Sequence, residues 1–366
     1  MAIASNYMRP SGRLKTSIAA DIAVVDGARG WVVLAILAAL LLILGAFGGN
    51  AVLARVNAIW FAVLGALALN LLTGFAGQVS LGSAAFLAIG AYTAAIFDRA
   101  LHLNILLAVP AAAITAGVVG VLVGIPSLRF KGFYLSLTTL ALHFIVIFGV
   151  IQYQTAVGGL EGFSLPTQEF GPLRLSGERP WYFLMGAITL IAVIGAINLI
   201  RTRVGRAWVA IRDRDIAASI IGIDVARYRL LAFAFTSAIF GATGCLQAYY
   251  HGNVASDGFT LDLAISFVAM IIIGGMGSIS GSILGAILVT QLSYVIQALV
   301  DQIQRLDPSL SNLSLGVFSL QSAAYGIVIM VFLMFEPKGL IGIWRRLHQR
   351  WRLWPYKRAS STRTAA

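Results

Sequence analysis

The sequence predicts an all-α polytopic membrane protein with about ten transmembrane helices and both termini in the cytoplasm. Of its 366 residues, 59% are hydrophobic and only 11% are charged, whereas a soluble domain carries about 25% charged residues. A bilayer core about 30 Å thick needs roughly 20 helical residues per crossing, and unpaired backbone cannot face lipid. Long apolar runs are therefore expected to be membrane helices, which excludes a compact soluble protein.

Ten apolar runs are long enough to be considered spans. They are expected at Val32–Gly48, Val52–Leu72, Val79–Phe97, Ile105–Ile125, Phe133–Ile151, Trp181–Ile200, Leu230–Tyr249, Leu261–Gly274, Ile279–Leu299 and Leu320–Phe335. Residues 1–30 mix basic and acidic residues over a long stretch, unlike the start of a cleaved signal peptide. We therefore expect an N-terminal cytoplasmic segment at 1–30, a permease domain at 31–336 and a basic cytoplasmic tail at 337–366.

The distribution of basic residues predicts the orientation. With the termini and the loop 201–229 inside, 21 of the 26 Lys and Arg residues are cytoplasmic, which satisfies the positive-inside rule. The basic residues left outside are Arg55, Arg99, Arg174, Arg179 and Arg305. The net charge of +12 is thereby explained without nucleic acid. The basic tail also carries Trp344, Trp351 and Trp354, which suits an interfacial anchor on anionic membrane lipid.

Catalytic motifs are missing from the sequence. The single cysteine, Cys245, and four scattered histidines form no metal-ligand spacing, so no metal is expected. The glycine-rich stretch Gly74–Gly82 has no following Lys-Ser or Lys-Thr and is not a phosphate-binding loop. We therefore predict a chain that is not an enzyme, binds no cofactor and leaves ATP hydrolysis to other chains.

Two polar stripes lie within the predicted spans. Their spacing places each set on one helical face, where it is expected either to line a solute path or to bond neighbouring helices. The candidate pore-lining residues are Ser136, Thr139 and His143 in the fifth span, and Thr236, Thr243 and Gln247 in the seventh. Gly277, Gly281 and Gly285 repeat every four residues, a spacing that favours close packing of two membrane helices.

Two loops are longer than a turn requires. The inner loop 201–229 is rich in arginine, and its centre, Trp208–Gly222, is expected to form one short helix ending at Gly222. The outer loop Gln152–Pro180 carries glycines, prolines and glutamates. On composition alone, each is either a solvated connection or a docking surface.

An ordered series of motifs resembles the permeases of branched-chain amino acid ABC importers, and in particular the longer of the two paralogous permeases. The matching segments are Leu72–Gly82, Ala84–Phe86, Gly90–Tyr92, Arg129–Leu135, Gly158–Gly162, Gly205–Ala207, Ile211–Arg212, Ala217–Ala218, Gly222–Ile223, Arg227–Leu230, Gly274–Gly281 and Phe335–Leu340.

The resemblance implies that the inner loop presents a coupling helix to a cytoplasmic ATPase. Ala217-Ala218 followed by Gly222 matches the core of that motif, although Ile216 stands where the wider superfamily has glutamate. The residues implied in coupling are Gly205, Arg206, Arg212, Asp215, Ala217, Ala218 and Gly222.

It also implies the partners of a bacterial inner-membrane importer: a paralogous permease subunit, two ATP-binding subunits and a periplasmic substrate-binding protein, which the outer loop would help to receive. Two alternatives stay open. The first is a permease of the same kind with another solute, since similar permeases serve urea, short amides or other amino acids. The second is a stand-alone secondary transporter or channel, although no acidic residue lies centrally in the predicted spans.

Overall fold

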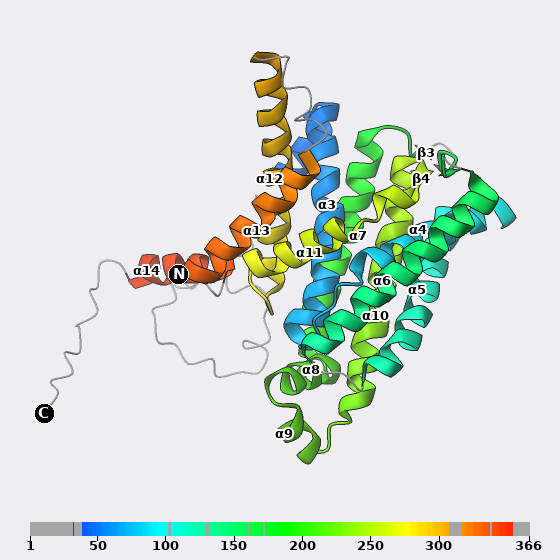
Figure 1. Ribbon diagram of the computed structural model, residues 1–366. Helices are drawn as coiled ribbons and strands as arrows, with labels where there is room; N and C mark the ends of the chain where they lie inside the picture. The colour runs from blue at the N-terminus through cyan, green and yellow to red at the C-terminus, as the bar shows by residue number, and fades with distance from the viewer. Residues whose placement is uncertain are drawn as a thin grey trace, which may run out of the picture.

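The chain folds as an all-α bundle with two short β ribbons at one end (Figure 1). The computed structural model describes residues 32, 39–101, 104–128, 132–159, 161–170, 173–306, 317–336 and 339–353. Within these ranges seven helices are long and apolar enough to cross a membrane: Asn50–Phe75, Ile105–Pro126, Tyr134–Gly158, Glu178–Arg201, Val225–His251, Ser256–Gly274 and Ile279–Gln302. A polytopic membrane fold is therefore confirmed.

The helices follow the predicted spans closely. Their bounds are α3 (Asn50–Asn70), η2 (Leu71–Phe75, a π-helical turn), α4 (Ser83–Leu101), α5 (Ile105–Ser127), α6 (Phe133–Tyr153), η3 (Gln154–Gly158), α7 (Glu178–Arg201), α8 (Arg203–Asp213), α9 (Asp215–Ile220), α10 (Val225–His251), η4 (Ser256–Gly258), α11 (Leu261–Gly274), α12 (Ile279–Leu306), α13 (Val317–Phe335) and α14 (Gly339–Leu353). Of the first predicted span, residues 39–47 are helical and most of the rest lies outside the described residues.

One predicted start is wrong. Helix α4 begins at Ser83 rather than Val79, and the preceding residues run without regular structure. Side chains hold this stretch in place: Thr139 Oγ1 accepts a hydrogen bond from the Leu81 amide at 2.9 Å, and Gln78 Nε2 donates to the Arg229 carbonyl at 3.1 Å. Because non-helical backbone at membrane depth must find partners inside the protein, these bonds explain why the chain leaves the helical path here.

Helices α4, α5 and α10 pack backbone to backbone. A Cβ added at Gly90 would lie 2.0 Å from the Gly241 carbonyl oxygen, and one at Gly241 would lie 2.5 Å from the Ala112 carbonyl oxygen. A Cβ at Gly244 would meet the Leu87 carbonyl oxygen at 2.1 Å. Small residues allow membrane helices to approach this closely, so these three helices form a tightly packed part of the core.

Helices α11 and α12 form a second close pair. A Cβ at Gly285 would lie 1.9 Å from the Met270 carbonyl oxygen, and one at Gly281 would lie 2.8 Å from the Gly274 carbonyl oxygen. The prediction that the glycine repeat serves helix packing is thereby confirmed for Gly281 and Gly285. The break predicted at Gly274 is also present, because α11 ends there and α12 starts at Ile279.

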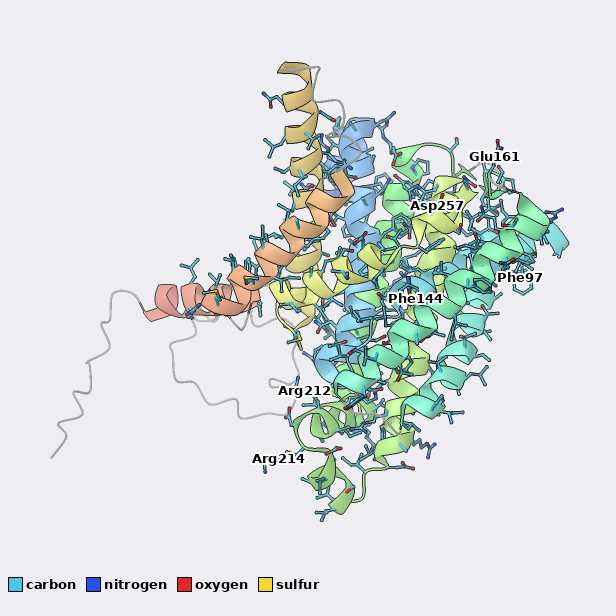
Figure 2. All side chains as sticks on the ribbon, in the orientation of Figure 1. Phe97, Phe144, Glu161, Arg212, Arg214 and Asp257 are labelled. Carbon is cyan, nitrogen blue, oxygen red and sulfur yellow. The ribbon has the colours of Figure 1, made fainter. Side chains whose placement is uncertain are left out.

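The two long loops lie at opposite ends of the bundle. The outer loop forms β1 (Phe163–Ser164), β2 (Glu169–Phe170) and β3 (Leu173–Arg174), and β1 pairs with β4 (Asn253–Val254) after α10. Figure 2 shows Glu161 and Asp257 at this end and Arg212 and Arg214 at the other. Three connections predicted on the inner side, at residues 74–78, 201–229 and 275–278, meet around Arg212 at that other end.

Candidate functional site

The inner loop folds into two helices rather than the single helix predicted over Trp208–Gly222. Helix α8 ends at Asp213, and Arg214 is extended, with φ −156° and ψ 102°, before α9 begins at Asp215. An extended residue cannot continue a helix, so α9 leaves in a new direction. The result is a bent arm, visible below the bundle in Figure 1.

Helix α8 is held firmly against the bundle. Trp208 and Ile211 are buried, and the Trp208 indole donates to the Tyr228 carbonyl of α10 at 2.9 Å. Gly205, one of the predicted coupling residues, allows α8 to fold back on α7, since a Cβ there would lie 2.3 Å from Ile200 Cα. Gly205 is therefore a packing residue at the base of the arm.

Helix α9 ends where the sequence predicted. The amide of Gly222 donates to the Ser219 carbonyl at 3.1 Å and that of Ile223 to the Ala218 carbonyl at 3.0 Å. These two bonds form a Schellman motif, which requires a left-handed residue, and Gly222 supplies it with φ +89°. A Cβ at Gly222 would meet nothing within 4 Å, so backbone conformation rather than space requires glycine here.

The outward face of α9 is strongly apolar. Ile216, Ile220 and Ile221 are 71%, 79% and 73% exposed. Ala218 is buried on the opposite face, and Ala217 is exposed. Exposed apolar side chains are expected on membrane-facing helices, but α9 belongs to a polar, arginine-rich loop outside the candidate spans. An apolar patch in such a place is typical of a surface that contacts another protein or a membrane.

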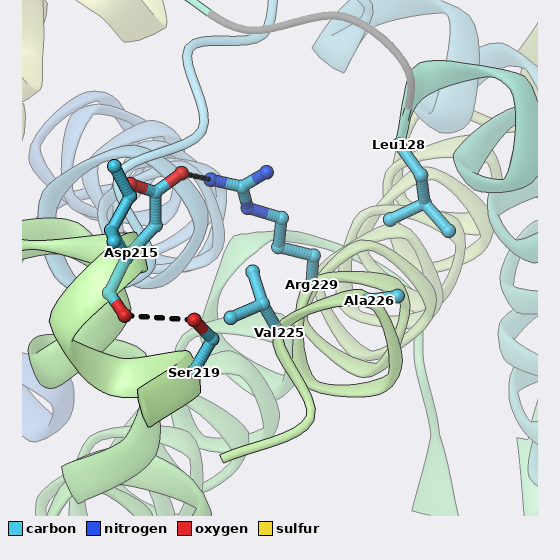
Figure 3. Close-up of a pocket in the computed structure, with 7 residues that line it drawn as sticks. Leu128, Asp215, Ser219, Val225, Ala226 and Arg229 are labelled. Carbon is cyan, nitrogen blue, oxygen red and sulfur yellow. Dashed lines mark hydrogen bonds and ion pairs between the residues drawn. The ribbon is translucent and has the colours of Figure 1, made fainter. Parts of the chain in front are cut away.

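An ion pair ties α9 to α10. Arg229 Nη2 lies 3.3 Å from Asp215 Oδ2, with the two side chains 17% and 26% exposed. Figure 3 shows the pair at one side of a groove of about 300 Å³, whose other walls include Leu128, Ser219 and Val225. The pair joins the start of α9 to the second turn of α10.

Arg212 joins the arm to the bundle at a second point. Its Nη1 donates to the Gly74 carbonyl at 2.8 Å, in the π-helical turn η2, while Nε and Nη2 donate to Asp213 Oδ1. A Cβ at Gly277 would lie 2.8 Å from Nη1, and one at Gly77 would lie 2.9 Å from Arg212 Cγ. The guanidinium thus contacts both the break after α3 and the turn between α11 and α12.

Asn70 connects those two breaks to each other. Its Nδ2 donates to the Ser278 carbonyl at 2.8 Å and to Ser282 Oγ at 2.6 Å, and its Oδ1 accepts from the Gly277 amide at 2.8 Å. The side chain is fully buried. We call the set Asn70, Gly74, Arg212 and Gly277 the inner junction. The sequence had not marked Asn70 as a site residue.

The remaining coupling prediction, Arg206, lies on the exposed side of α8. Its Nη1 donates to the Arg201 backbone carbonyl at 2.6 Å. It therefore reinforces the turn between α7 and α8.

The two predicted pore-lining stripes are buried on α6 and α10, two helices that both contact α4. Helices α6 and α10 both pack against α4, and Thr139 bonds the segment that leads into it. Thr236 and Thr243 donate within their own helix, to the Ala232 and Ile239 carbonyls. The buried members are Ser136, Thr139, His143, Thr236 and Thr243, and Gln247 is half-buried.

Within the described ranges no group of three or more His, Cys, Asp and Glu side chains is arranged to hold a metal ion.

Comparisons with known proteins agree with this architecture. Residues 51–335 match the family described as the permease component of the branched-chain amino acid transport system. The chain is 32% identical over 252 residues to the high-affinity branched-chain amino acid transport system permease LivM of Salmonella typhimurium LT2, an alignment covering 62% of this chain and 59% of that protein. LivM of Escherichia coli K12 gives the same identity and coverage.

An archaeal relative extends the comparison. The probable branched-chain amino acid transport permease LivM of Methanocaldococcus jannaschii is 28% identical over 246 residues, which cover 65% of this chain and 68% of that protein. The chain thus spans about three fifths of the length of the bacterial relatives. There is no significant match among solved structures. With seven membrane-length apolar helices in the part of the chain that the structure describes, this multi-pass protein of the bacterial inner membrane belongs to the branched-chain amino acid transport permease family.

Proposed function

We propose that this chain is one membrane-spanning half of a binding-protein-dependent ABC importer. It moves branched-chain or related amino acids into the cell with energy from ATPase subunits on separate chains. Its family membership and the transport functions named for its relatives support this proposal, and the exposed apolar face of α9 is the structural observation on which it rests.

The face of α9 fits the role of a coupling surface. Three isoleucines outside the spans, each more than two thirds exposed, are costly in water, and covering each would contribute about 1.5–3 kcal/mol at full burial. A groove on a cytoplasmic ATPase would cover them. The Ile216 side chain, at the position where the wider superfamily carries glutamate, makes this contact more apolar than the superfamily motif implies.

The inner junction gives that contact a route to the membrane helices. When the ATPases close, α9 moves, the Asp215–Arg229 pair pulls on α10, and Arg212 acts on the turns beside Gly74 and Gly277. Turns and helix breaks absorb such changes in backbone angle, which allows packed helices to rock between inward-open and outward-open states. The permease thus supplies the route and the coupling, and no catalytic step.

The working importer comprises further subunits in this proposal. A paralogous permease completes the translocation path. Two ATP-binding subunits dock at the α9 end. A periplasmic binding protein docks at the other end, where the β ribbons and the exposed Glu161 and Asp257 lie.

This arrangement requires a specific topology. We propose ten spans with both termini in the cytoplasm, residues 1–30 as a cytoplasmic segment, 31–336 as the permease domain and 337–366 as a cytoplasmic tail. The grouping of the three inner connections around Arg212 supports this assignment.

Replacement of Ile220 by glutamate tests the proposal. The variant should insert normally, because the side chain is exposed, but should not co-purify with the ATPase subunits or support ATP-driven leucine uptake in proteoliposomes. A matched control is Arg203→Glu, a change at another exposed position of the arm, which should retain both properties. Normal uptake by the Ile220 variant, or accumulation driven by an ion gradient with no ATPase present, would overturn the proposal.

A further inference from the structure

The amphipathic helix α14 follows the last apolar helix and differs from it in composition. It holds arginine at positions 345, 346, 350 and 352 and no acidic residue. Leu340, Ile343, Trp344, Leu347 and Trp351 recur at the spacing that places them along one helical face. In Figure 1, α14 runs crosswise to α3 and α12 rather than along them.

The described side chains of that face lack protein cover over much of their surface. Ile343, Trp344 and Leu347 are 43%, 61% and 50% exposed, while Leu340 packs against the core. The helix thus begins inside the protein and extends outward with its apolar face open.

The first turn of α14 fixes the helix close to the end of α13. Glu336, which is almost fully buried, pairs with Arg346, and its carbonyl accepts the Gly339 amide at 2.8 Å. A Cβ at Gly339 would lie 2.7 Å from both the Gly275 nitrogen and the Ile273 carbonyl oxygen. The start of α14 is therefore packed on the turn between α11 and α12. Helix α13 ends at Phe335, close to the same turn.

A helix with an open apolar face, four arginines around the rest of its sequence and two tryptophans, held at the end of the apolar helix α13, has the composition of an interfacial helix. We propose that α14 binds the anionic lipid surface of the cytoplasmic leaflet, with its apolar face among the acyl chains and its arginines on the phosphate groups. The four arginines of α14 favour an anionic lipid over a neutral one. They also favour a lipid surface over an apolar protein groove, which would offer them no negative charge. This inference depends on the membrane fold and not on the solute.

The same packing links lipid to the inner junction. Gly339 contacts Gly275, and Gly277, two residues further, touches Arg212 and bonds Asn70. Lipid that holds α14 in place therefore also holds the turn that the inner junction uses.

Spin labels on the full-length chain measure the placement of α14. In a Cys245→Ala background, single labels are introduced by Leu347→Cys, on the apolar face, and by Gln349→Cys, about half a helical turn away. The protein is reconstituted in phosphatidylcholine bilayers with and without phosphatidylglycerol. With the anionic lipid, the label at 347 should be relaxed more by dissolved oxygen than by a water-soluble nickel complex, and the label at 349 should show the reverse.

Three results would overturn the proposal. Equal access of the nickel complex to both labels would place α14 in water, and protection of both labels from both reagents would place it under protein. An unchanged profile without phosphatidylglycerol would remove the role of the anionic lipid.

Charge removal provides an independent test. The triple variant carries Arg345→Gln, Arg350→Gln and Arg352→Gln, and a control with equal charge loss at the other end carries Arg55→Gln, Arg99→Gln and Arg179→Gln. Each arginine near an anionic surface contributes about a fivefold preference. From equal amounts of the two lipids, the wild type and the control should therefore retain phosphatidylglycerol preferentially, and the α14 variant should lose most of that preference. Equal retention by all three proteins would refute the charge argument.

Discussion

Replacing Asn70 by alanine would test the inner junction at its most buried point. The change removes three hydrogen bonds and leaves the Gly277 amide without its side-chain partner, whereas the Ser278 carbonyl keeps the Ser282 amide. A buried group left unpaired costs about 1–3 kcal/mol, and hydrogen bonds between membrane helices fall at or below the lower end of that range. We therefore expect the free energy of unfolding to fall by about 2–4 kcal/mol.

The functional effect should exceed the loss of folded protein. A bias of about 2 kcal/mol between junction conformations changes an equilibrium by more than about tenfold. In the reconstituted importer, ATP-driven uptake per folded molecule should therefore fall by about tenfold or more while ATP hydrolysis continues. Unfolding in mixed micelles measures the first effect, and uptake with parallel ATPase assays measures the second.

Asn57 offers a matched control on the same helix. It is also fully buried, and its Nδ2 donates to the Glu178 backbone carbonyl at 3.0 Å and to Glu178 Oε2 at 2.9 Å, near the outer end. Asn57→Ala should lose comparable stability but keep uptake per folded molecule. If the Asn57 and Asn70 variants reduced uptake equally, the inner junction would have no special part in coupling and our reasoning would fail.

Three further predictions concern the arm and the inner junction. Gly222→Ala should cost about 1–2 kcal/mol through its positive φ and reduce uptake, whereas Gly177→Ala, at φ +84° in an equally open position, should cost the same in micelle unfolding and leave uptake intact. Asp215→Arg should impair uptake by the reconstituted importer, and adding Arg229→Asp should restore part of it; a double variant no better than the single one would contradict the ion-pair role. Gly74→Ala should lower the unfolding free energy by about 3 kcal/mol, since its Cβ would lie 1.9 Å from a buried amide oxygen; stability within error of wild type would show that the turn rearranges easily.

Helix positions followed from the sequence because membrane spans need long apolar runs. The predicted bounds Leu261–Gly274 agree with α11 at both ends, where a glycine break ended the run. The start of α4 was missed because residues 79–82 are compatible with a helix by composition. Their path is decided by hydrogen bonds to Thr139 and Arg229, which are remote in sequence.

The site was predictable only where the signal was local. Gly222 ends α9 because a Schellman motif needs left-handed backbone, and that requirement is visible in the sequence. The bend at Arg214 had no such signal, since no proline or glycine marks it. Asn70 did have one: an amide inside an apolar run is costly in lipid and therefore suggests a bonded partner. Its partners, two hundred residues away, required the structure.

The backbone contact among α4, α5 and α10 bears on how motion in this protein should be measured. Helices that are separated by side chains can slide past each other as those side chains change rotamer. Where a backbone carbonyl lies directly against a glycine, no side chain is present to rearrange, so the two helices cannot slide in this way. These three helices will travel together through the cycle. They provide a fixed internal frame, against which displacements of the arm, α12 and α14 can be recorded with paired probes.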